Sequence, residues 1–265
     1  MAKIGFVGMG NLGYAMLKGI LKTYKPSDII FSQRNLDKMK KVSSETGVEY
    51  ATSNAECVNK SKYVILAVKS QMFDDVFDSI KNVVTKEHVI ISLAPGITIE
   101  QIRERLGYDL RVVRTMPNTP ALVGEAMTGV CYDEKIFSDE EKEIIERLFT
   151  SIGKMKIVPE KLMDAVVCAS GSSPAYVYMF IEALADGAVK CGMPRNDAYE
   201  FVAQTVFGSA KMVLDTKAHP GILKDMVCSP GGTTIAAVEK LEEYGFRNAI
   251  MKATDACYDK CHNIK

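Results

Sequence analysis

The stretch Lys3-Ile-Gly-Phe-Val-Gly8-Met9-Gly10-Asn11-Leu12-Gly13 joins a short apolar run to three glycines spaced GxGxxG, and a helical pattern over residues 14–22 follows. In a strand–turn–helix unit the first glycine permits a tight turn, the second lets backbone approach a pyrophosphate, and the third allows close helix–strand packing. The helix N-terminus then faces the anion. The pattern predicts a dinucleotide-binding turn at residues 8–13; the alternative is a glycine-rich turn without a ligand.

Downstream of this turn, short apolar runs alternate with helical stretches as far as residue 159. Such alternation predicts a Rossmann-type, doubly wound α/β domain, because parallel strands are joined by helices that cover both faces of the sheet. The predicted strands cover residues 3–7, 28–32, 48–50, 63–68, 89–93, 111–116, 126–132 and 155–158. Capping boxes that mark helix starts pair Ser53 with Glu56, Thr98 with Gln101, and Ser138 with Glu141.

After residue 159 the strand pattern stops, and the rest of the chain is predicted to be helical. We therefore expect a dinucleotide-binding domain over residues 1–159 and an all-helical domain over residues 160–265. The helix predicted over residues 174–191 is apolar on nearly all sides, so it must be covered all round. We infer that it packs against a second copy of the chain in a homodimer; a well-packed monomeric bundle is the alternative.

The 33 basic and 33 acidic residues balance, so no net basic field favours nucleic acid or an anionic membrane as a partner. The chain starts without the apolar segment of a signal peptide and has no apolar run near ~20 residues, so we expect a cytoplasmic protein without membrane spans. Most of the seven cysteines are expected to be reduced core residues. Cys257, Cys261 and His262 share about one helical turn but lack further ligands, so no metal site is expected.

The second predicted strand ends in Phe31-Ser32-Gln33-Arg34-Asn35, without the carboxylate that NAD-specific sites usually place there. Ser32 can donate to a 2′-phosphate, and Arg34 can make a charge-assisted contact with it. This pattern favours NADPH, with NADH possible. A solvent-exposed Arg34 on a surface turn is the alternative.

Other turns that follow predicted strands should line the same cleft, because ligands bind at the carboxyl ends of parallel strands. Lys69 follows the fourth strand and is expected to lie over the cofactor; a solvated lysine is the alternative. The turns at residues 92–96 and 116–120, which contain Ala94, Pro95 and Asn118, close the next two strands. Prolines on both sides of Asn118-Thr119 stiffen the second turn, which suits a wall beside a nicotinamide ring; a purely structural turn is the alternative.

Three stretches of the helical region carry a resemblance. Residues 168–195 (CASGSSPAYVYMFIEALADGAVKCGMPR), 204–208 (QTVFG) and 219–235 (HPGILKDMVCSPGGTTI) closely resemble the pyrroline-5-carboxylate reductase family, and the similarity runs the whole length of the chain. The resemblance implies reduction of Δ1-pyrroline-5-carboxylate to L-proline, the last step of proline biosynthesis, by NADPH or NADH. It also implies a homodimer intertwined through the helical domain, in some members assembled into a decamer.

Carried over position by position, the resemblance implies that the substrate is bound by Ser229, Gly231, Gly232, Thr233 and Thr234. The cofactor contacts expected from the residues and the resemblance together are Gly8, Met9, Gly10, Asn11, Leu12, Gly13, Ser32, Arg34, Asn54, Ala67, Val68, Lys69, Ser70, Ala94 and Pro95. The chain departs from the family pattern at two of these positions: the family commonly has proline at Ser70 and alanine at Pro95.

The reaction needs no strong side-chain acid, because a protonated cyclic imine already has an electrophilic carbon that can accept hydride. The protein must hold the substrate carboxylate, which we place on residues 229–234, at the N-terminus of a helix predicted over residues 235–244; an ordinary Ser/Thr-capped helix start is the alternative. Asn118 is also predicted to bind the substrate. Thr234 is the predicted catalytic residue, through a hydrogen bond to the substrate nitrogen. The three histidines, His88, His219 and His262, have no convincing catalytic context.

Two other functions remain open from the residues alone. A β-hydroxyacid dehydrogenase-like NADP oxidoreductase would need a general acid or base, usually a lysine on the helix after a Ser-Gly turn. Residues 174–189 contain no lysine, and Lys190 comes only at the end of that helix. A non-catalytic NADP-binding regulator would not need the intact Ser-Pro-Gly-Gly-Thr-Thr turn at residues 229–234.

Overall fold

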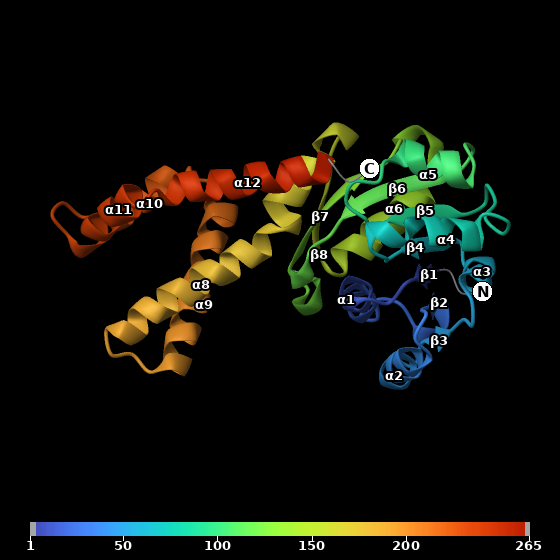
Figure 1. Ribbon diagram of the computed structural model, residues 1–265, viewed down its shortest axis with the longest axis horizontal. Helices are drawn as coiled ribbons and strands as arrows, with labels where there is room; N and C mark the ends of the chain where they lie inside the picture. Colours follow the sequence, from blue (N-terminus) through green and yellow to red (C-terminus); the bar gives the residue numbers. More distant parts are fainter. Residues whose placement is uncertain (1–3, 263–265) are drawn as a thin grey trace. The chain divides into compact units, whose positions relative to one another are not determined.

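The computed structural model describes residues 4–262 of the chain, and within them eight strands form one sheet (Figure 1). The strand order is β3-β2-β1-β4-β5-β6-β7-β8, and every neighbouring pair is parallel except β6 and β7. This order confirms the predicted doubly wound sheet. The strands are β1 Ile4–Val7, β2 Ile29–Ser32, β3 Glu49–Tyr50, β4 Tyr63–Leu66, β5 Val89–Ser92, β6 Arg111–Met116, β7 Ala126–Cys131 and β8 Gly153–Ile157.

Helices cover both faces of the sheet, and the buried residues form one core on each face. Successive residues of a strand point to opposite faces, so Phe6 packs under α1, α2 and α6, whereas Val7 packs under α3, α4 and α5. The helices of this layer are α1 Asn11–Ile20, α2 Leu36–Thr46, α3 Asn54–Asn59, α4 Phe73–Ile80, α5 Ile99–Leu106 and α6 Asp139–Thr150. Short helical turns between them are η1 Pro26–Asp28, η2 Ser70–Met72, η3 Thr119–Val123 and η4 Glu134–Ile136.

The remaining elements are helical, as the pattern after residue 159 predicts. They are η5 Glu160–Leu162, α7 Met163–Val166, the π-helix η6 Val167–Gly171, α8 Ser173–Lys190, α9 Arg195–Thr216, α10 Pro220–Val227, α11 Thr233–Glu243 and α12 Phe246–His262. Helices α8 and α9 pack together around Ala185, Ala198 and Val202. Most of α8 is nevertheless exposed within a single chain, since only Ala185 of this helix is buried.

The predicted helix starts are realised by side-chain caps, with one rearrangement. Thr98 and Ser138 form complete capping boxes with Gln101 and Glu141. Ser53 accepts from the Glu56 backbone N–H at 3.1 Å, but the Glu56 carboxylate accepts from the backbone and hydroxyl of Thr52, at 2.7 and 2.8 Å. The reciprocal bond of the third box is therefore displaced by one residue.

The chain separates into two compact units by its internal contacts, and the domain boundary at 159/160 stays a prediction. The first unit runs to Ser172 and includes the end of α12 from Cys257 onward; the second is Ser173–Ala256. Residues just after 159 stay with the first unit because buried Arg114, on β6, donates to Glu160 at 3.4 Å and to Asp164 at 3.0 Å. The sequence pattern that predicts strands therefore stops at residue 159, before the first compact unit ends at Ser172.

No helix within residues 4–262 is long and apolar enough to cross a membrane. In the same part of the chain, no three His, Cys, Asp or Glu side chains are grouped so that they could hold a metal ion. Lys3, at the expected start of the first strand, and the side chain of His262 lie outside the described residues.

A buried ion cluster fixes α6 to the edge of the sheet where β4 and β6 begin. The Glu141 carboxylate, on a residue 1% exposed, accepts from Arg111 Nη1 at 2.5 Å and from Lys62 Nζ at 3.0 Å. Burial alone would raise the pKa of Glu141, but the bond from Lys62, the Ser138 N–H and the Arg111 charge lower it below its usual value. The carboxylate is therefore ionised and part of the fold.

We predict that Glu141→Gln lowers the free energy of unfolding at neutral pH by about 2–3 kcal/mol, because it leaves Arg111 and Lys62 without their buried partner. The folded-state pKa of Glu141 lies below the unfolded value, so its contribution is present above the unfolded pKa and is lost as pH falls through the folded pKa. The difference between the two proteins should shrink on acidification. Urea unfolding at fixed protein concentration measures both effects.

Glu143→Gln is the matched control on the same helix. Its carboxylate pairs with Arg147 at 2.5 Å, but both side chains are more than half exposed. We expect a loss of less than about 1 kcal/mol. Equal losses in the two variants would contradict a role for the buried cluster in holding α6.

Candidate cofactor site and substrate turn

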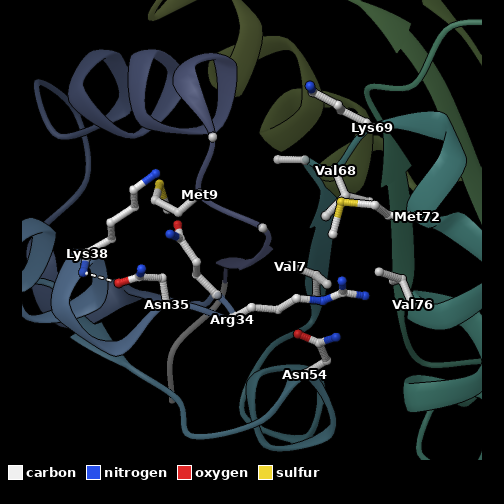
Figure 2. Close-up of a pocket in the computed structure, with 14 residues that line it drawn as sticks. Val7, Met9, Arg34, Asn35, Lys38, Asn54, Val68, Lys69, Met72 and Val76 are labelled. Carbon is white, nitrogen blue, oxygen red and sulfur yellow. Dashed lines mark hydrogen bonds between the residues drawn. The ribbon is translucent and has the colours of Figure 1, made fainter.

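A pocket lies where the order of the sheet reverses. Strand β1 pairs with β2 on one side and β4 on the other, and Val7 is level with both Ser32 and Leu66, so three carboxyl ends meet at one edge. Ligands of doubly wound folds bind at this switch point. The pocket has a volume of about 370 Å³ (Figure 2) and is lined by Val7, Gly8, Met9, Gly10, Gln33, Arg34, Asn35, Lys38, Asn54, Ala67, Val68, Lys69, Met72 and Val76.

The glycine turn is shaped by its contact with the segment after β4. Gly8 has φ +96°, and a Cβ there would lie 2.5 Å from Val68 Cγ1 and 2.7 Å from the Ala67 carbonyl oxygen. A Cβ on Gly13 would lie 3.1 Å from Ala67 Cβ. A Cβ on Gly10 would meet nothing within 4 Å, and Gly10 precedes α1 without a side-chain cap. Gly8 and Gly13 are therefore required by packing, whereas Gly10 leaves an uncapped helix N-terminus open to a ligand.

About half of the cofactor contacts expected from the sequence line this pocket. Those that do are Gly8, Met9, Gly10, Arg34, Asn54, Ala67, Val68 and Lys69. Those not among the lining residues are Asn11, Leu12, Gly13, Ser32, Ser70, Ala94 and Pro95. Ala94 is 2% exposed because it belongs to the core beneath α3, α4 and α5. The structure therefore concentrates the site on the ends of β1, β2 and β4.

Ser32 has a hydrogen-bond partner within the fold, and its contact with the cofactor stays a prediction. It is 2% exposed, and its hydroxyl donates to Asn54 Oδ1 at 2.8 Å. Asn54 Nδ2 in turn donates to Ser79 Oγ at 2.9 Å, and Ser79 Oγ donates to the Val76 carbonyl at 2.7 Å. This chain of hydrogen bonds gives Ser32 a positioning role, since it holds Asn54 at the edge of the pocket.

The β2–α2 connection contributes polar residues that the sequence analysis missed. Gln33, Asn35 and Lys38 line the pocket beside Arg34. Asn35 caps α2 by accepting from the Lys38 N–H at 2.9 Å, which places the first turn of that helix at the pocket. Figure 2 shows Lys38 on the side of the pocket opposite Met72 and Val76, and the Arg34 side chain extending away from Lys38 toward Val76. The Asn cap three residues before Lys38 was a signal that could have indicated this second cation.

Arg34 is exposed, and it forms an ion pair with Asp75 of helix α4. Its Nη2 lies 2.7 Å from Asp75 Oδ2, with both side chains about two-thirds exposed or more. Such a surface pair contributes little stability, so Arg34 can exchange this partner for an anionic ligand at small cost. Asp75 belongs to α4, so the position directly after β2 remains without a carboxylate.

Asn118 ties neighbouring loops together and does not line the pocket. Its Nδ2 donates to the Ser170 carbonyl at 3.1 Å, and its Oδ1 accepts from the Met127 N–H at 3.1 Å. These bonds join η3 to the π-helix η6 and to β7. The observed hydrogen bonds therefore support a structural role for Asn118, and its contact with the substrate stays a prediction.

The predicted substrate turn connects α10 to α11 in the second compact unit. Gly231 has φ +67°, a conformation that favours glycine, and Gly232 N–H donates to the Ser229 carbonyl at 3.0 Å. Helix α11 begins at Thr233, two residues before the predicted start at 235, so Thr233 and Thr234 lie in its first turn. Gly232 precedes the helix without a side-chain cap, which leaves backbone N–H groups of that turn for an anion.

Comparisons with known proteins agree across both parts of the chain. The family model "Pyrroline-5-carboxylate reductase dimerisation" matches residues 160–264, and "NADP oxidoreductase coenzyme F420-dependent" matches residues 3–96. Pyrroline-5-carboxylate reductase of Escherichia coli K12 is 43% identical over 264 residues, covering 99% of this chain and 98% of that protein. The Methanosarcina acetivorans enzyme is 43% identical over 253 residues, covering 95% and 93%.

Solved structures agree as well. Plasmodium falciparum pyrroline carboxylate reductase with NADP bound has a TM-score of 0.90 at 32% identity, covering 99% of this chain and 98% of that one. The Streptococcus pyogenes enzyme has a TM-score of 0.88 at 35% identity, covering 98% of each chain. Because relatives at this identity span nearly its whole length and share its fold, the chain belongs to the pyrroline-5-carboxylate reductase family.

Proposed function

We propose that the chain reduces Δ1-pyrroline-5-carboxylate to L-proline, with NADPH as the preferred hydride donor and NADH as a possible one. The observation that carries this proposal is that this chain has both sites that the reaction requires. One is the pocket at the GxGxxG turn, and the other is the uncapped α11 N-terminus at Ser229–Thr234. A cytoplasmic location and assembly into a decamer stay predictions from the sequence and the resemblance.

The residues of the pocket fit a phosphorylated dinucleotide. The space beside Gly10 and the uncapped start of α1 suit a pyrophosphate. Arg34 and Lys38 supply two cations at the wall that follows β2, where a 2′-phosphate would lie. When bound, the cofactor supplies a hydride from its nicotinamide ring.

The site must position the substrate and neutralise the negative charge of its carboxylate. We assign its carboxylate to the first turn of α11, where the helix dipole and the N–H groups after Gly232 attract an anion without an arginine. A Cβ on Gly232 would lie 2.9 Å from Ser229 Oγ, so a side chain there would crowd the turn. Thr234, in the same turn, is assigned the hydrogen bond to the ring nitrogen, which loses its positive charge when the adjacent carbon accepts hydride.

The second compact unit supports a homodimer. Val177, Tyr178, Met179 and Phe180 form one continuous stretch of α8, and they are 40, 59, 68 and 38% exposed in a single chain. A helix that is apolar on most sides and uncovered by its own chain requires a partner surface. The matching family model is described as a dimerisation domain and covers this helix, which supports a second copy as that partner.

For cofactor choice, we predict that Arg34→Asp raises the KM for NADPH by about tenfold or more and leaves the KM for NADH nearly unchanged. The lost contact is a charge-assisted bond to the 2′-phosphate, worth roughly 1.5–3 kcal/mol, which NADH does not make. Steady-state kinetics with each cofactor measure the ratio. Arg147→Asp, which removes an arginine from another exposed ion pair, is the control. Equal losses with both cofactors would show that Arg34 is structural.

For the reaction, the purified protein should oxidise NADPH only when the imine is present, and β-hydroxy acids should not support the reverse reaction. Thr234→Ala should lower kcat/KM for the imine, and Gly232→Val should abolish turnover by filling the anion site. Neither change should alter the Kd for NADPH, measured by fluorescence titration. Thr150→Ala, an exposed hydroxyl bonded to its own helix, is the control. Unchanged kinetics in both variants would remove this turn from the active site.

For assembly, light scattering at micromolar concentration should give at least twice the chain mass of 29.2 kDa. Met179→Glu should shift the protein toward monomer, because it places a charge on the exposed apolar face of α8. Tyr108→Glu, at a residue 70% exposed in the first unit, should leave the mass unchanged. A monomeric wild-type protein with full activity would refute the homodimer.

A further inference from the structure

Gln33 presents an unsatisfied hydrogen-bond acceptor at the wall of the cofactor pocket. It directly follows β2, and its Oε1 atom is buried without a hydrogen-bond partner among the described residues. The other buried side-chain atoms without partners in this part of the chain are Tyr24 Oη, Tyr63 Oη and Thr128 Oγ1, and none of them lines the pocket. A buried carbonyl oxygen without a donor is costly, so a ligand that supplies a donor gains affinity there.

Neighbouring polar groups already have partners within the fold. The Ser32 hydroxyl donates to Asn54, and the amide of Asn54 donates to Ser79. The Asn35 carbonyl oxygen caps α2. The Arg34 guanidinium pairs with Asp75 and, like Lys38, can only donate. Gln33 is therefore the side chain that offers a buried, unsatisfied acceptor to a ligand in this pocket.

The place of this acceptor in the fold indicates which part of the ligand it meets. In NAD-specific sites an acid near the end of the second strand accepts a hydrogen bond from the 2′-hydroxyl of the adenosine ribose. A glutamine carbonyl can accept the same bond without a negative charge, so it does not repel a 2′-phosphate. If its amide turns by half a rotation, the Nε2 group can instead donate to that phosphate.

We propose that Gln33 reads the 2′ position of the adenosine ribose and makes this chain able to use both cofactors. Its carbonyl oxygen accepts from the 2′-hydroxyl of NADH, and its amide nitrogen donates to the 2′-phosphate of NADPH. Arg34 and Lys38 add positive charge, which attracts the 2′-phosphate of NADPH but not the neutral 2′-hydroxyl of NADH. The inference rests on the proposed use of this pocket by a nicotinamide dinucleotide, and it assigns the capacity for NADH to one residue.

Two variants separate this role from packing. Gln33→Glu should raise the Kd for NADPH by about tenfold, because a carboxylate repels the phosphate, while the Kd for NADH stays equal or falls. Gln33→Met, of similar length but without the amide, should raise the Kd for NADH about fivefold and that for NADPH less than twofold, since Arg34 and Lys38 remain. Both constants are measured by fluorescence titration without the imine. A change in packing would alter both cofactors alike.

Gln71→Glu is the matched control, since Gln71 is an exposed glutamine of η2 that is not among the pocket residues, and it should not change the ratio of the two Kd values. Reduced nicotinamide hypoxanthine dinucleotide, which lacks the adenine amino group, should bind the wild type as NADH does. If this analogue binds as weakly as NADH binds Gln33→Met, Gln33 reads the base and the proposal is overturned. Equal shifts for both cofactors, or none, overturn it too.

These measurements are independent of turnover. A protein that shows the expected Kd pattern but does not oxidise NADPH with the imine would refute the proposed reaction alone. A protein that turns over the imine, with variants that keep the wild-type Kd ratio, would refute the role of Gln33 alone.

Discussion

The contact between the glycine turn and the segment after β4 is the constraint on which the cofactor site depends. Gly8 packs so closely against Ala67 and Val68 that a Cβ would overlap them, and Gly13 brings α1 onto the same segment. Close packing of this kind transmits any change in volume to the backbone. The start of α1 is therefore held beside the end of β4, where the pocket opens.

Hydrogen bonds from outside the turn complete the pocket. Ser32 holds Asn54 across 22 positions of sequence, and Asn35 sets the first turn of α2 beside the same edge of the sheet. These bonds have well-defined geometry but modest individual energies. They hold Asn54 and the first turn of α2 at the edge of the sheet where pairing already brings the ends of β1, β2 and β4 together, around one pocket.

The two compact units divide the chemistry. The first has backbone at Gly10 and cations at Arg34 and Lys38 around its pocket, whereas the second has an uncapped helix start at Thr233, to which we assign the anionic substrate. Neither site relies on a histidine or a buried acid, which agrees with an electrophile that is already activated when protonated. Most of α8 is exposed in a single chain, so the second unit contains both an uncovered apolar helix and, on α11, the predicted substrate turn.

Local patterns in the sequence determined the strands, most helix starts and the dinucleotide turn, because these depend on side-chain periodicity and on conformations that only glycine adopts cheaply. They also predicted Arg34 and the 67–69 segment, which follow strands directly. The hydrogen bond from Ser32 to Asn54 and the unsatisfied acceptor of Gln33 appear only in the tertiary structure, since partners distant in sequence are not contained in local patterns. The point where the first unit ends was likewise decided by Arg114 and its acidic partners, because burial of a charge depends on packing that periodicity does not contain.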